Sequence, residues 1–140
     1  MFWDSSAVVP LLLPDARSAG IATLLRSDAE PALWWASPVE CQSALYRRHR
    51  EGGLPTTALT QALERLKALV ADVDIVAPTP PLRERAGRLL AGHPLRAADA
   101  LQLAAALVWC DESPQGDAFV CLDDRLAEAA RREGFTVLPG

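Results

Sequence analysis

Residues 95–110 read LRAADALQLAAALVWC, and this stretch decides the fold. From Ala97 onward it consists of strong helix formers, and Asp99 and Gln102 are its only polar residues. A helix that is apolar on nearly every side must be buried. Residues 97–110 are too few to cross a bilayer, which takes about 20 residues. We therefore predict a core helix over this range, with Asp99 in its first turn.

Asp99 has two possible explanations at this stage. A negative charge in the first turn of a helix is favoured by about 0.3–1 kcal/mol through the helix dipole. A carboxylate at the edge of a packed core, however, needs a partner, a hydrogen-bond network or a metal ion. The choice depends on whether other acids in the chain converge on Asp99.

The composition predicts one globular domain over residues 1–140, because half of the chain is hydrophobic. Its net charge of −4 is unlike the basic charge usual in nucleic-acid-binding domains. The arginines nevertheless form three local clusters: Arg47, Arg48 and Arg50; Arg83, Arg85 and Arg88; Arg131 and Arg132. Arginine suits bidentate phosphate contacts, although solvated helix faces also explain such clusters.

The cysteines and the first residues bear on the cellular compartment. Cys41, Cys110 and Cys121 are far apart and form no CxxC pair, which argues against a disulfide framework or a zinc site. The opening MFWDSS lacks the basic and apolar regions of a signal peptide. We expect a cytoplasmic protein with no membrane association.

Short apolar runs alternate with helix-forming segments along the whole chain. We expect strands at residues 2–4, 32–36, 74–77, 119–122 and 136–138, and helices after Ser5 and at residues 15–26, 37–50, 56–71, 82–91, 97–110 and 125–133. Such alternation is typical of a parallel sheet covered on both faces. The predicted fold is therefore α/β, a three-layer α/β/α sandwich with a central parallel sheet of about five strands.

Four acids occupy equivalent places in this scheme. Asp4 and Asp123 follow strands directly, and Glu40 and Asp99 lie in the first turns of helices. Ligands of open α/β sheets bind at the carboxyl ends of the strands, so these side chains can meet in one cleft. Local explanations also exist: Asp4 can cap a helix, and residues 37–40 (SPVE) read as a capping box with Ser37 as N-cap.

Converging carboxylates repel one another unless protons or cations compensate their charge. Oxygen ligands without His or Cys favour Mg²⁺ or Mn²⁺, and such ions suit the hydrolysis of phosphodiester bonds. We therefore predict that Asp4, Glu40 and Asp99 bind a metal ion, with Asp4 and Asp99 as its main ligands. Asp123 would assist or hold a second ion.

Four motifs follow one another along the chain: Asp4-Ser5-Ser6, Pro38-Val39-Glu40, residues 95–101 (LRAADAL) and residues 119–123 (FVCLD). In this order they resemble the PIN-domain family, and within it the VapC-type ribonuclease toxins. The resemblance spans essentially the whole chain and implies an α/β/α sandwich with Mg²⁺- or Mn²⁺-dependent cleavage of RNA. It also implies a homodimer and inhibition by a small antitoxin protein whose tail lies across the cleft.

By this resemblance Asp4, Glu40 and Asp99 correspond to the three main acids of the family, and Asp123 to its more variable fourth acid. Ser6 matches a hydroxyl residue that supports the first acid. The chain departs from the common pattern in two ways. The strand before the fourth acid ends in CLD, at a place where Thr is frequent in the family. The loop that precedes this strand, DESPQGD, is long. These departures leave Asp117 and Asp124 as alternatives to Asp123.

Other assignments stay open. Arg96, three residues before Asp99, can hold a phosphate or serve as a partner of Asp99, and we favour the second role. A non-catalytic PIN-like binding module is the main alternative function. A phosphotransfer enzyme on a doubly wound sheet fits poorly, because the first strand is not followed by Asp-x-Asp and the single lysine, Lys67, lies within a predicted helix.

Overall fold

The computed structural model describes residues 1–13 and 18–140 and contains a parallel sheet of five strands. The strands are β1 (Phe2–Trp3), β2 (Ala32–Trp34), β3 (Asp74–Val76), β4 (Ala118–Val120) and β5 (Thr136–Leu138), in the order β3-β2-β1-β4-β5. In the central strand, Phe2 pairs with Ala32 on one side and with Phe119 on the other. The predicted parallel sheet is confirmed.

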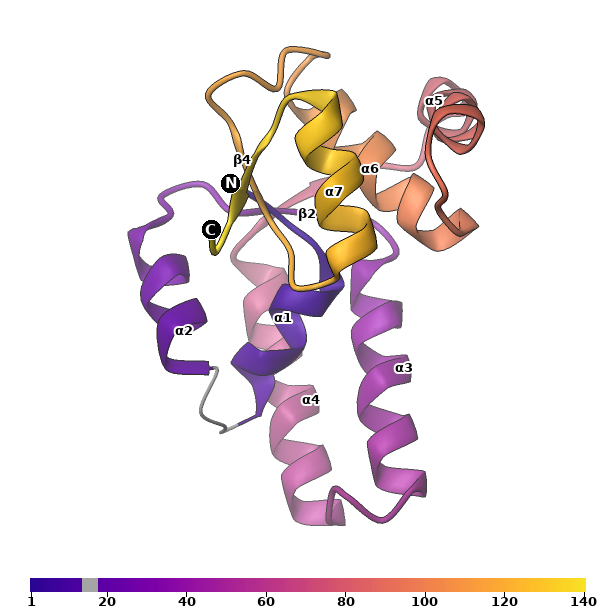
Figure 1. Ribbon diagram of the computed structural model, residues 1–140. Coiled ribbons are helices and arrows are strands. Elements are labelled where there is room, and N and C mark those ends of the chain that lie inside the picture. The colour runs from indigo at the N-terminus through magenta and orange to yellow at the C-terminus, as the bar shows by residue number, and fades with distance from the viewer. Residues whose placement is uncertain (14–17) are drawn as a thin grey trace.

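Helices cover both faces of this sheet, as predicted for a three-layer α/β/α sandwich (Figure 1). They are α1 (Ser5–Leu12), α2 (Ser18–Ser27), α3 (Ser37–Arg50), α4 (Thr56–Ala71), α5 (Pro80–Gly92), α6 (Ala97–Trp109) and α7 (Asp124–Glu133). The beginning of the helix predicted at residues 15–26 lies outside the described residues. The long helices α3 and α4 pack side by side as a hairpin.

Alternating side chains of the strands supply two separate cores. Phe2 and Phe119 lie in the core beneath α5, α6 and α7, whereas Trp3, Leu33 and Val120 lie in the core beneath α1, α3 and α4. This period of two is what a strand buried on both faces requires. Each face of the sheet therefore has its own layer of helices.

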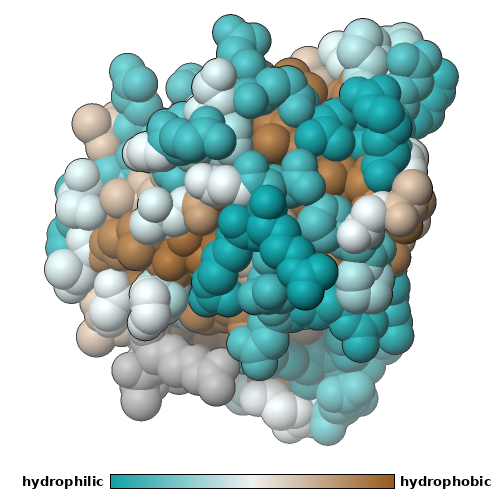
Figure 2. Space-filling view, turned by 45° about the horizontal axis from the view of Figure 1, so that its top comes forward, coloured by the Kyte–Doolittle hydropathy of each residue, from teal (hydrophilic) through white to brown (hydrophobic). Residues whose placement is uncertain are grey.

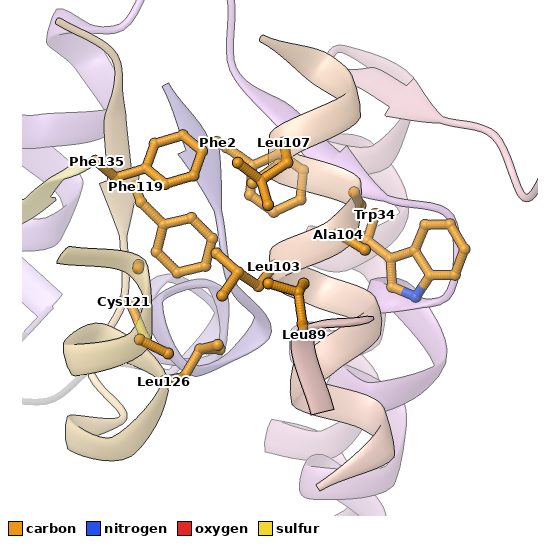
Figure 3. Close-up of a cluster of buried hydrophobic side chains, with 14 of the residues drawn as sticks. Phe2, Trp34, Leu89, Leu103, Ala104, Leu107, Phe119, Cys121, Leu126 and Phe135 are labelled. Carbon is orange, nitrogen blue, oxygen red and sulfur yellow. The ribbon is translucent and has the colours of Figure 1, made fainter. Parts of the chain in front are cut away.

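Helix α6 is the core helix that the sequence predicts, and it ends one residue earlier, at Trp109. Its residues 102–107 are all buried. Figure 3 shows Leu103 beside the ring of Phe119 and Leu107 beside that of Phe2; the two rings stack with centroids 5.6 Å apart.

Across the described residues, no helix is both long and apolar enough to span a membrane. Hydrophilic side chains dominate the face in Figure 2, with smaller hydrophobic areas exposed between them.

The predicted capping box at the start of α3 is wrong. The N-cap is Ala36, whose carbonyl accepts from the backbone N–H groups of Val39 and Glu40 and whose side chain makes no capping bond. Ser37 therefore lies inside the helix and is buried. Because α3 begins one residue earlier than the box requires, the side chains of Ser37 and Glu40 are available for contacts with other helices.

Helix α7 ends at a glycine C-cap, Gly134. Gly134 adopts a φ of 111°, and its N–H bonds to the carbonyls of the last turn. A Cβ atom here would lie 3.1 Å from Cγ of Pro114. Both the backbone conformation and the close approach of Pro114 require glycine.

Candidate active site

Asp4 lies where β1 ends and α1 begins, and it is buried, with 3% of its surface exposed. Its Oδ2 accepts hydrogen bonds from the backbone N–H of Ser6, at 3.1 Å, and from the Ser6 hydroxyl. The Ser6 hydroxyl in turn accepts from the N–H of Leu122, at 2.9 Å. Ser6 thus orients Asp4 and ties the end of β1 to the end of β4. A backbone hydrogen bond from Ser5 also favours the ionised form of this carboxyl group, although burial raises its pKa overall.

Glu40 reaches the same edge from the first turn of α3. Its Oε1 accepts from Nε2 of Gln102 on α6, at 2.9 Å, and its Oε2 lies 3.4 Å from the hydroxyl of Ser5 on α1. The same Nε2 of Gln102 donates to the buried Ser37 hydroxyl, at 2.8 Å. Three helices therefore fix this one carboxylate. The sequence analysis missed Ser5 and Gln102 as contacts of Glu40.

Asp99 and Asp123 complete the acidic edge. Asp99 is half-buried in the first turn of α6. Asp123 is exposed, and its Oδ1 accepts from the N–H of Leu126, at 2.9 Å, which caps α7. Asp124 lies beside Asp123 and lines the same surface cleft, which is described below. Asp117 precedes β4 and lies at the opposite end of that strand. The position of Asp117 thus removes it from the candidate site.

The electrostatics show that the four acids are close neighbours. Burial is the main cause that raises the pKa of Asp4, Glu40 and Asp99, and it brings the pKa of Glu40 to about 7. Charge repulsion adds to it: Asp99 raises the pKa of Asp4, Asp4 and Asp99 raise that of Glu40, and Asp123 raises that of Asp99. The ionised forms of Asp4, Glu40 and Asp99 are therefore disfavoured, and a nearby cation would stabilise them.

A cleft of about 680 Å³ is lined by the acids Glu40, Asp99, Asp123 and Asp124, whereas the buried Asp4 is not part of its lining. Arg47, Arg96 and Arg125 also line it. Among the described residues, none of these three arginines forms an ion pair. Arg96 and Arg125 lower the pKa of Asp99 through their charge. The cleft therefore combines carboxylates with guanidinium groups that can bind an anion.

The sequence profile of the PIN domain matches residues 1–132. This chain belongs to the PIN-domain family. PIN domains are generally nucleases that use divalent metal ions, so the chain carries the fold of hydrolases that act on nucleic acids.

Two solved structures share this fold over nearly the whole chain. PAE2754 from Pyrobaculum aerophilum matches with a TM-score of 0.68 and 19% identity, covering 98% of this chain and 87% of that one. FitAcB from Neisseria gonorrhoeae matches with a TM-score of 0.67 and 15% identity, covering 97% of this chain and 94% of that one. At such identities the likeness concerns the fold alone. The comparison with curated proteins found no match to this sequence.

The acidic edge of this PIN domain fits a hydrated divalent ion better than a closed cage. Over residues 1–13 and 18–140, no set of three or more His, Cys, Asp or Glu side chains is arranged to hold a metal ion. Mg²⁺, however, usually keeps several waters and binds through one or two carboxylates. Asp4 and Asp99 supply carboxylate oxygens, and beside burial the charge of Asp99 raises the pKa of Asp4, so this pair fits that smaller requirement.

Proposed function

We propose that this PIN domain is a metal-dependent ribonuclease that hydrolyses phosphodiester bonds with Mg²⁺ or Mn²⁺, and that it is the toxin of a toxin–antitoxin pair. The observation that carries the proposal is the convergence of Asp4, Glu40 and Asp99 at one edge of the sheet, where burial and then the charges of neighbouring carboxylates raise the pKa of each. The choice of RNA rests on the resemblance to VapC-type toxins.

The acids would divide the work according to their surroundings. Asp4 and Asp99 would hold the ion, and Asp123, which is exposed beside Asp99, would assist or hold a second one. When bound, such an ion lowers the pKa of a coordinated water and offsets negative charge on the phosphate. Glu40 lines the cleft with its carboxylate fixed by Gln102 and Ser5, so it can accept the proton of the attacking water.

The arginines would bind the RNA backbone. Arg47 on α3 and Arg125 on α7 line the cleft from two different helices, and both side chains are exposed. Guanidinium groups donate paired hydrogen bonds to phosphate oxygens and stabilise charge that develops there. Arg96 also acts on Asp99, since its charge favours the ionised carboxylate.

Substitution of the acids tests the proposal. Asp4→Asn keeps a residue that caps helices well, so the protein should stay folded while RNA cleavage falls by about 100-fold or more. Asp99→Asn should behave alike. Glu84→Gln, an exposed acid on α5, is the matched control and should keep full activity. Circular dichroism would verify folding of each variant.

Removal of the metal separates the competing functions. Cleavage should require Mg²⁺ or Mn²⁺ and stop in EDTA. Equal cleavage in EDTA would refute the metal mechanism. A folded protein that binds RNA without cleaving it in Mn²⁺ would instead support the non-catalytic binding module.

We also propose that the chain forms a homodimer and binds a small antitoxin, as the VapC-type resemblance implies. The exposed side chains of Val39 and Tyr46 on α3 offer apolar contact area for a protein partner. Light scattering would give the oligomeric state. Co-expression with the product of an adjacent small reading frame should yield a complex with reduced RNA cleavage; an unchanged cleavage rate would argue against this partner.

A further inference from the structure

Gln102 is a buried polar residue in the middle of an otherwise apolar stretch of α6. Its side chain is completely buried, with 0% of its surface exposed. Its Nε2 makes two hydrogen bonds, to the Ser37 hydroxyl at 2.8 Å and to Oε1 of Glu40 at 2.9 Å. Its own Oε1 is buried and has no hydrogen-bond partner in the described chain. The NH₂ group of the amide thus makes two hydrogen bonds, whereas its carbonyl oxygen makes none in the described chain.

The amide can point only one way while Glu40 is ionised. An ionised carboxylate can only accept hydrogen bonds, so it must face the NH₂ group of Gln102. The reverse orientation would place two oxygens against each other and would bury two unpartnered N–H groups. The observed orientation leaves a single orphaned acceptor, and it uses both hydrogens of Nε2 to hold Glu40 and Ser37.

Stability does not explain this choice of residue. A buried acceptor without a partner destabilises a fold, and a leucine of similar size would fill the site among the neighbouring apolar side chains without that defect. Residues that lower stability while they hold a reactive group in place are typical of functional sites.

We propose that Gln102 is a positioning residue for the cleavage reaction: it holds the Glu40 carboxylate in the cleft, with Ser37 as the second anchor of its amide. The role in cleavage rests on the proposed ribonuclease function. The hold on Glu40 itself is a property of the metal-free protein and can be tested without RNA.

Gln102→Leu is the main test. We expect kcat for RNA cleavage to fall about 10–100-fold, as for other residues that orient a ligand or catalytic group, with KM changed less than about threefold. The melting temperature should stay within about 3 °C of wild type or rise. Gln61→Leu, at an exposed position on α4, is the matched control and should change neither quantity.

Two further variants keep the test decisive. The double variant Ser37→Ala with Gln102→Leu removes both polar groups, so it should fold while kcat stays low. Gln102→His restores a donor of comparable reach and should recover at least about fivefold in kcat over Gln102→Leu. Loss of about 5 °C or more in both leucine variants would instead assign Gln102 a purely structural role.

Carbon NMR of the Glu40 carboxyl in metal-free protein gives a readout apart from activity. The hydrogen bond from Gln102 lowers the pKa of Glu40, so the titration midpoint should move up in Gln102→Leu. If the midpoint does not move, or if Gln102→Leu keeps full kcat, the inference about Gln102 is refuted. Cleavage of RNA by wild type would at the same time support the proposed function. Absence of cleavage by wild type would refute the ribonuclease, and the NMR result would still decide whether Gln102 holds Glu40.

Discussion

Replacing Glu40 by glutamine should stabilise the metal-free protein at pH 8. The substitution keeps the shape of the side chain and an oxygen that can accept from Gln102, and it removes one negative charge. Burial, followed by the charge of Asp4, raises the pKa of Glu40 from 4.5 to about 7. The folded protein therefore holds an unfavourable charge at pH 8 that the unfolded chain does not feel.

The sign and size of the effect follow from proton linkage. Between pH 4.5 and 7 the folded state keeps a proton on Glu40 that the unfolded chain has lost, so the stability contributed by this group falls as pH rises through that window and then levels off. The pKa rise would correspond to about 3 kcal/mol in a fully shielded site. Since Glu40 is partly exposed, solvent screening reduces the expected gain for Glu40→Gln to about 1–2 kcal/mol.

Thermal unfolding in EDTA would measure this gain. For a domain of this size, 1–2 kcal/mol corresponds to a rise in melting temperature of about 3–8 °C at pH 8. At pH 5.5 the gain should be less than about half as large, because much of the repulsion is then relieved by protonation. Glu84→Gln should show no such gain at either pH. Mn²⁺ should stabilise wild type more than Glu40→Gln, because the ion compensates the same charge.

An equal gain at both pH values would mean that the stabilisation comes from packing and not from charge. No gain at pH 8 would mean that neither burial nor the charge of Asp4 disfavours the ionised form of Glu40. Either result would contradict the electrostatic description of the site and, with it, the main support for a cation there.

Two further predictions concern the scaffold. Leu103→Ala in the core face of α6 should lower the free energy of unfolding by about 2–5 kcal/mol. Val108→Ala, at a partly exposed position on the same helix, should change this free energy far less, and urea denaturation would compare the two variants. Gly134→Ala should destabilise by about 1–2 kcal/mol because of its positive φ, and Gly87→Ala, inside α5 with no atom near its Cβ position, should stabilise by about 0.5–1 kcal/mol. Opposite signs in the same urea series would support this reading, and equal signs would contradict it.

Local sequence patterns predict the sheet and its helices, and the errors of these predictions lie at the ends of the strands and helices. Apolar runs predict all five strands of the described chain. The reason is that strands buried on both faces, such as β1 and β2, carry apolar side chains; the edge strands β3 and β5 also carry the exposed Asp74 and Thr136. The predicted strand at residues 2–4 is too long, since Asp4 already caps α1. The predicted helix at residues 82–91 starts too late, since the hydroxyl of Thr79 caps α5. Both errors come from side chains that accept backbone hydrogen bonds, which hydrophobic patterns do not record.

The placement of the acids at one edge also follows from the sequence, whereas their contacts do not. Helical periodicity could have placed Arg47 in the cleft, because it lies seven residues, or two turns, after Glu40 on the same side of α3. The contact between Glu40 and Gln102 joins residues 62 positions apart on different helices. No local rule predicts it; its only sequence signal is a glutamine in an apolar helix.

Capping and site chemistry are compatible roles for the same acids. Oδ2 of Asp4 caps α1, and Oδ1 of Asp123 caps α7 beside the cleft. Glu40 and Asp99 also lie in first turns. Each helix N-terminus favours a nearby negative charge by about 0.3–1 kcal/mol, which helps four carboxylates to assemble at one edge. The pKa of three of them is still raised by burial and by neighbouring charges, so the helix termini offset only part of these effects. The remaining repulsion is what a divalent cation would relieve.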